Sequence, residues 1–223
     1  KYFHDIQHQI IFHNFIFFYK TSIRKASEYY DVEVIYYLLL KVETIYDVLF
    51  RKNNKIKRIA IPTSITSIGK NAFYGCSSLT QIKIPSSVTS IGEYAFSGCS
   101  TLTQITIPSS VTSIGESAFY RCSSLTQITI PSSVTEIRFN GCLSLTQIKI
   151  PSSVTEIGSY AFSGCSTLTQ ITIPSSVTSI GESAFYRCSS LTQITIPSYV
   201  TTIEKYAFSE CSSLTQITIP SSV

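Results

Sequence analysis

Seven cysteines are the side chains of this sequence with the greatest capacity for chemistry, because a thiolate can bind zinc or form a disulfide. The nearest two, Cys122 and Cys142, are 20 residues apart, whereas zinc sites place paired cysteines about two to four residues apart. Their number is odd, and each follows a phenylalanine by three residues. We therefore predict reduced thiols that act as small core hydrophobes, with no metal site and no cofactor. The cysteines are Cys76, Cys99, Cys122, Cys142, Cys165, Cys188 and Cys211.

Two smaller groups could also do chemistry. His4, His8 and His13 have a spacing loosely like that of metal ligands on a helix, but no cysteine or carboxylate set accompanies them. We expect ordinary histidines there. The basic run 51–58 could contact nucleic acid or acidic lipid, but it lies between regions of different composition, which favours a solvated connector.

Residues 59–223 hold no catalytic set. They contain no histidine and no aspartate, so nothing is present to activate their many serines and threonines. Their glycines stand singly and form no phosphate-binding loop. We predict no catalytic residues, and we expect the chain not to be an enzyme.

Charge and composition divide the chain near residue 55. Residues 1–58 hold ten Lys and Arg against six Asp and Glu, whereas residues 59–223 hold seven of each sign. The neutral part gives no electrostatic reason to expect nucleic-acid binding. Every proline, glycine and cysteine follows residue 58. We predict two regions, 1–55 and 56–223.

Prolines reveal the repeat that must position these residues. Pro62, Pro85, Pro108 and Pro131 are 23 residues apart, Pro151 follows after 20, and the 23-residue step then returns. A unit this short cannot bury a core alone, so successive units must stack into a solenoid. We expect about seven coils, and an array that is broken off at Val223.

Each coil has a readable pattern. The alternation in 79–84 predicts a strand with one buried face, ended by Pro85; residues 88–91 predict a second short strand. In 93–99 a helical or 3₁₀ turn is expected to bury Ala95, Phe96 and Cys99. The coil at 137–142 lacks three residues but keeps its Phe and Cys, which we expect to point inward. The fold class predicted is an α/β repeat solenoid.

The pattern L-T-x-I-x-I-P-x-x-V-T-x-I-G-x-x-A-F-x-x-C-x-x-L resembles the BspA-like class of leucine-rich repeats over residues 56–223. The resemblance implies a right-handed superhelix with a parallel β-sheet on its concave face. It also implies surface or secreted proteins that adhere to matrix proteins or host cells, with no catalytic residues to transfer.

Residues 1–55 are expected to form a small, mainly helical segment that caps the first coil. Val34, Leu38, Val42, Ile45 and Leu49 recur at helical steps, and 21–40 is weakly similar to an ankyrin repeat. The apolar run 10–19 is about half of the roughly 20 residues that a membrane span needs. No transmembrane segment is predicted.

The outward strand positions are the predicted binding site. A protein or a glycan-bearing surface is the expected partner, in adhesion at the cell surface or outside the cell. The alternative is an intracellular, cytoplasmic scaffold for protein–protein interaction. Self-association through the open C-terminal coil is also predicted. The positions are Gln81, Lys83, Gln104, Thr106, Gln127, Thr129, Gln147, Lys149, Gln170, Thr172, Gln193, Thr195, Gln216 and Thr218.

Overall fold

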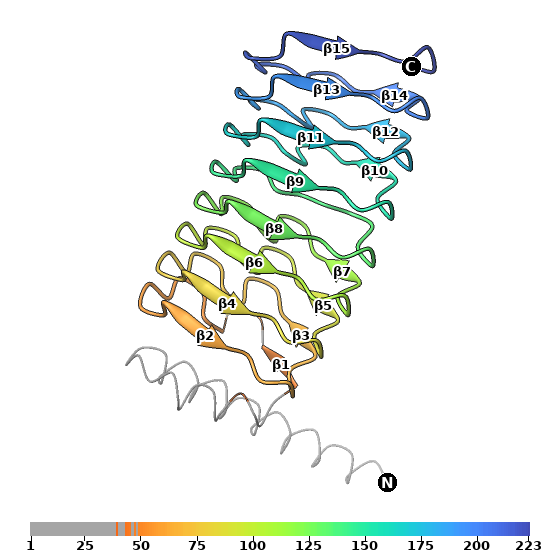
Figure 1. Cartoon of the computed structure of the whole chain (residues 1–223). Helices are drawn as coiled ribbons and strands as arrows, with labels where there is room; N and C mark the ends of the chain where they lie inside the picture. The colour runs from red at the N-terminus through yellow and green to blue at the C-terminus, as the bar shows by residue number, and fades with distance from the viewer. Residues whose placement is uncertain (1–38, 40–42, 46, 48) are drawn as a thin grey trace, which may run out of the picture.

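The computed structural model describes Leu39, residues 43–45, Asp47 and residues 49–223. Most of the predicted helical segment, and the ankyrin-like motif apart from Leu39, lie outside these residues. The described chain stacks coil upon coil, with one series of strands along each side (Figure 1). The longer strands are β2 (Arg58–Ala60), β4 (Gln81–Lys83), β6 (Gln104–Thr106), β8 (Gln127–Thr129), β9 (Gln147–Lys149), β11 (Gln170–Thr172), β13 (Gln193–Thr195) and β15 (Gln216–Thr218). The shorter strands are β1 (Thr44–Ile45), β3 (Ser67–Ile68), β5 (Ser90–Ile91), β7 (Ser113–Ile114), β10 (Glu156–Ile157), β12 (Ser179–Ile180) and β14 (Thr202–Ile203).

All paired strands are parallel, and each residue lies opposite its equivalent in the next coil. Gln104 faces Gln127, and Ser90 faces Ser113. This confirms the parallel solenoid. The longer strands form four hydrogen-bonded pairs rather than one continuous sheet: β2–β4, β6–β8, β9–β11 and β13–β15. Three-residue strands make few ladder bonds, so a small rotation between coils is enough to interrupt the ladder.

The core is a column of phenylalanine rings. Neighbouring rings stack with centroids 5.0 to 6.1 Å apart. Ala95, Phe96 and Cys99 are fully buried, as predicted, and so are Phe139 and Cys142 of the short coil. The buried strand isoleucines complete the core. The rings in the column are Phe50, Phe73, Phe96, Phe119, Phe139, Phe162, Phe185 and Phe208.

The corner of each coil is a run of β-turns, so the predicted helical or 3₁₀ turn is wrong. N–H groups do bond carbonyls three residues back, as from Ser97 to Tyr94 at 3.1 Å. Left-handed residues interrupt the run, however, with φ 53° at Tyr94 and 71° at Gly98, and they prevent a helix from continuing. The described coils are therefore built of strands and turns, and the α/β class is not what the structure shows.

At the corner, backbone N–H groups that would bond within the same segment in a helix donate instead to carbonyls of the next coil. Phe96 donates to the carbonyl of Ala118 at 2.8 Å, and Gly98 donates to that of Tyr120 at 2.7 Å. The corner thus holds neighbouring coils together in the same way as the strands do.

The stack begins before residue 56, where the sequence predicts the repeats to start. Strand β1 pairs with β3, and Phe50 stacks on Phe73. Ile45 and Leu49, predicted on a helical stripe, are buried in β1 and in a turn. The basic run 51–58 is part of this first coil and not a connector, because Ile56 is buried and the run ends in β2.

The short coil interrupts the array. Residues 136–137 form no strand, so the shorter strands make one sheet of four, β1-β3-β5-β7, and one of three, β10-β12-β14. Around Phe139 the ring separations rise to 5.8 and 6.1 Å with tilts of 21° and 24°; elsewhere they stay within 5.6 Å and 15°. Ser117 and Phe119 would find their carbonyl acceptors in the deleted residues, and they make no such bond.

We predict that an alanine is tolerated at Gly158 and not at Gly115. A Cβ on Gly115 would lie 2.3 Å from the backbone N of Glu93, whereas one on Gly158 would meet only the Arg138 guanidinium at 4.0 Å. Gly115→Ala should lower the free energy of unfolding by roughly 1–3 kcal/mol, and Gly158→Ala should leave it nearly unchanged. Urea titration followed by circular dichroism measures both. Equal destabilisation would show that the short coil opens no space at this corner.

Candidate protein-binding face

The exposed first and third residues of the eight longer strands form one surface, which we call the Gln face. Every predicted outward residue in these strands is exposed. The isoleucine in the middle of each strand points into the core. The structure thus brings all fourteen predicted positions together on one side (Figure 1). Their role in binding remains a prediction.

In the strand pairs β6–β8 and β13–β15, like side chains on the Gln face lie opposite each other. Gln193 pairs with Gln216 and Thr195 with Thr218. Glutamine carries both a donor and an acceptor, so the column offers the same hydrogen-bonding groups in every longer strand from β4 to β15. This surface can dock a partner by repeated weak contacts, and nothing in it resembles a reaction centre.

One strand of the Gln face, β2, was not predicted from the sequence. Arg58 and Ala60 in β2 pair with Gln81 and Lys83 and are exposed like them. At these positions the other coils have Gln and then Thr or Lys, and Asn53 stands where they have cysteine. The 23-residue spacing from Phe50 to Phe73 was the signal that could have revealed this coil.

A shallow hollow of about 320 Å³ lies on the Gln face between β8 and β9. It is lined by Gln127 and Thr129 on one strand and by Gln147 and Lys149 on the other, with Ile128 and Ile148 also in the lining. Strands β8 and β9 are joined by the short coil, and they belong to different hydrogen-bonded pairs. The hollow therefore coincides with the interruption of the array.

Serine and threonine hydroxyls are structural donors between coils. Ser87 donates to the carbonyl of Ile65 at 2.6 Å, and Ser110 donates to that of Val88 at 2.7 Å. Threonines do the same along the adjacent backbone, as Thr126 does to Thr103 at 3.0 Å. These hydroxyls are engaged in holding the stack rather than being poised as nucleophiles.

The cysteines are buried as predicted, and each thiol donates to a phenylalanine carbonyl of the preceding coil. The Cys122 Sγ lies 3.2 Å from the carbonyl of Phe96, and the Cys165 Sγ lies 3.2 Å from that of Phe139. All seven are free thiols in the structure. Burial raises the pKa of Cys122 and of Cys165 to about 12, so the reactive thiolate is suppressed at neutral pH.

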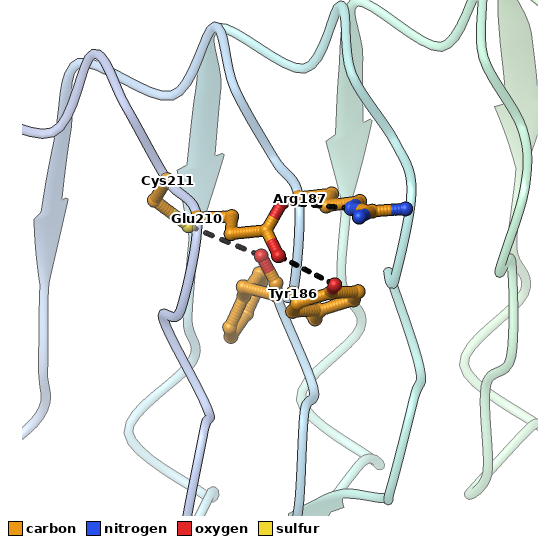
Figure 2. A network of polar contacts seen from close by, with 5 residues as sticks. Tyr186, Arg187, Glu210 and Cys211 are labelled. Atoms are coloured by element: carbon orange, nitrogen blue, oxygen red, sulfur yellow. Dashed lines mark hydrogen bonds and ion pairs between the residues drawn. The ribbon is translucent and has the colours of Figure 1, made fainter.

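Charged side chains at the corners pair across coils. Figure 2 shows the Glu210 carboxylate between Tyr186 and Arg187, accepting from the Tyr186 hydroxyl at 2.6 Å and from Arg187 Nε at 2.8 Å. The Arg187 guanidinium also lies over the Tyr186 ring, 5.0 Å from its centroid. The hydrogen bond from Arg187 lowers the pKa of Glu210. These exposed contacts link neighbouring coils and form no enclosed site.

Within the described part of the chain, no three His, Cys, Asp or Glu side chains gather where they could bind a metal ion. His4, His8 and His13 lie outside it. Among the same residues, no helix has the length and apolar character needed to cross a membrane.

Comparison with known proteins identifies the family. A model of the BspA type leucine rich repeat region matches residues 43–140 and 138–223, in six copies. The chain belongs to the BspA-type leucine-rich repeat family. The matched region begins at residue 43, in agreement with the first coil. The family is consistent with a non-catalytic, protein-binding role.

Solved structures show the same architecture. A leucine-rich repeat protein of T. pallidum is 29% identical with a TM-score of 0.62, over 67% of this chain and 72% of that one. A leucine-rich repeat protein from Bacteroides ovatus is 25% identical with a TM-score of 0.56, over 80% of this chain and 70% of that one. A search of curated proteins gave no match.

We predict that Ser110 stabilises the stack and that its neighbour Ser109 does not. Ser110→Ala leaves the carbonyl of Val88 without its hydroxyl donor and should lower the free energy of unfolding by about 1 kcal/mol. Ser109 is exposed, so Ser109→Ala is the matched control and should change little. Urea denaturation compares the two variants. If they are equally stable, the serine column is not structural.

We predict that the buried thiols make the protein less stable in alkali. The Cys122 thiol has a pKa of about 12 in the folded protein, against the usual 9.0. Above pH 9 the thiol of the unfolded chain loses its proton while the buried thiol keeps it, so the free energy of unfolding is highest below pH 9 and falls as the pH rises toward 12. The slope is about 1.4 kcal/mol per pH unit for each such thiol. The free energy of unfolding of the Cys122→Ala variant should therefore fall less steeply with pH, by that amount per pH unit. Parallel curves for the two proteins between pH 9 and 11 would refute the shift.

Proposed function

We propose that this chain is an adhesion protein that binds another macromolecule through the Gln face. The observation that carries the proposal is the column of exposed, chemically equivalent side chains, presented at every coil by a rigid core. Its preferred partner is a protein, and a glycan-bearing surface is the alternative within the same proposal. The concave shape of this face is part of the proposal.

Multivalency gives such a surface its strength. The two outward side chains of one strand make weak contacts, but contacts that are fixed relative to one another act together once the first has formed. The stacked phenylalanines hold neighbouring coils at a nearly constant separation, so the loss of freedom on binding is small.

The cell surface, or the space outside the cell, is the proposed location. The resemblance of the repeat to surface-associated leucine-rich repeats supports it. Antibody staining of intact, unpermeabilised cells that make the protein tests it directly. Staining that appears only after permeabilisation would remove the adhesion role.

An intracellular scaffold is the second candidate, and one observation favours it. All seven cysteines are free thiols, and free thiols are typical of reducing compartments. The Gln face would then bind a protein inside the cell. Permeabilisation-dependent staining, with a partner recovered from the same cell by crosslinking to the Gln face, would establish this role.

We predict that the Gln face, and not the opposite side, carries the binding. The triple variant Gln127→Ala, Gln170→Ala, Gln193→Ala should weaken binding to a matrix or cell preparation at least about tenfold, because contacts in a multivalent array multiply. The control is Ser113→Ala, Glu156→Gln, Thr202→Ala, at exposed positions of the shorter strands. Surface plasmon resonance compares both with the parent. The proposal fails if the control triple weakens binding as much as the glutamine triple does.

A further inference from the structure

The Gln face carries charge of a single sign. Among the exposed positions of its eight strands there are three cations, Arg58, Lys83 and Lys149, and no carboxylate. Residues 59–223 as a whole have equal numbers of acids and bases. Their glutamates lie elsewhere: Glu156 is in β10, Glu136 is in the short coil where no strand forms, and the others are at the corners. The neutrality of this region therefore conceals a separation of charge between its sides.

Within residues 59–223, the five cations that lie away from the Gln face are already engaged. Four of them pair with glutamates, with N–O distances of 2.6 to 3.5 Å: Lys70 with Glu93, Arg138 with Glu116, Arg187 with Glu210 and Lys205 with Glu182. A fifth, Arg121, lies over the ring of Tyr120 at 5.0 Å. Figure 2 shows one of these arrangements, in which the Glu210 carboxylate accepts a hydrogen bond from Arg187 Nε.

Lys83 and Lys149 are the two remaining cations of residues 59–223. Both are exposed, and in the described part of the chain neither forms an ion pair. Their neighbours in register are Ala60 for Lys83 and Thr172 for Lys149, which bring no negative charge. Lys149 is also one of the residues that line the hollow of about 320 Å³ between β8 and β9.

The spacing of the two lysines suits an extended chain. Strands β6 and β8 lie between β4 and β9, so three coil steps separate Lys83 from Lys149. Of these strands only β6 and β8 pair with each other, and the phenylalanine rings of the three steps lie 5.2, 5.6 and 5.8 Å apart, so the two positions are roughly 17 Å apart along the stack. In an extended polypeptide, residues four apart lie on the same side and span about 13 Å, and the long, flexible lysine side chains can make up the difference. A partner with acidic residues at that spacing can reach both ammonium groups at once while it runs across the strands.

We propose that the partner of the Gln face is a protein with an extended acidic segment, whose carboxylates pair with Lys83 and Lys149 while its backbone and polar side chains bond the glutamines. This inference rests on the proposed function and gives the partner its chemistry. The second carboxylate occupies the hollow beside Lys149. The glutamine column supplies the contacts between the two ion pairs.

The test uses the full chain and a defined probe. A threonine-rich peptide with two glutamates four residues apart is immobilised at high density, beside the same peptide with glutamines in their place and beside a single-stranded oligonucleotide. We expect binding to the glutamate peptide only. Each of Lys83→Gln and Lys149→Gln should weaken it about threefold to fivefold at low salt, and raised salt should weaken binding of the parent.

The control variants are Lys70→Gln and Lys205→Gln, which remove equal charge from corner residues that already have glutamate partners. These should bind the peptide like the parent. Equal binding of the parent and the Lys83→Gln, Lys149→Gln double variant would overturn the inference. Lysine-dependent binding to the oligonucleotide as strong as that to the peptide would overturn the choice of a protein partner.

The two proposals fail in different ways. If the glutamine triple variant loses binding to cells or matrix while the lysine double variant keeps it, the Gln face binds but its partner is not acidic. If neither set of changes affects binding to cells or matrix, the Gln face is not the binding surface, and both proposals are wrong.

Discussion

Backbone hydrogen bonds between equivalent residues of neighbouring coils are the constraint on which the rest of this structure depends. They run through the strands, as in the pairing of Gln104 with Gln127, and through the corners, where Phe96 donates to Ala118. Because both sides of each coil are tied in this way, one coil can differ from the next only where its side chains still fit the same backbone path. Residues of one type are thus forced into columns.

Each column of equivalent side chains has its own structural role. Phenylalanine rings fill the centre, cysteine thiols donate to carbonyls beside them, and serine and threonine hydroxyls satisfy carbonyls nearer the surface. Residue types that would suggest nucleophilic chemistry in another protein here act as hydrogen-bond donors between coils. In residues 59–223 these hydroxyls and thiols occur without any histidine or aspartate.

The short coil shows what happens when the backbone path is altered. Losing three residues preserves Phe139 and Cys142 in the core but removes a strand, tilts the neighbouring rings and leaves room beside Gly158. It also coincides with the hollow beside Lys149 on the Gln face. The deletion at one corner and the hollow on the Gln face thus lie in the same part of the stack.

The sequence alone determined the period, the inward and outward sides of each strand, and the burial of Phe96 and Cys99, because a repeat of fixed length allows few ways to bury its apolar residues. It could not reveal the left-handed residue at Tyr94, which turns an apparent helical spacing into β-turns. For Phe50 the sequence held only the 23-residue spacing to Phe73, and its place in the stack was established by the structure, since the first coil shares the shape of the others but few of their residue types. Which lysines lack a carboxylate was also decided by the tertiary structure, because the glutamates that neutralise the corner cations come from other coils, roughly a full repeat away in the chain.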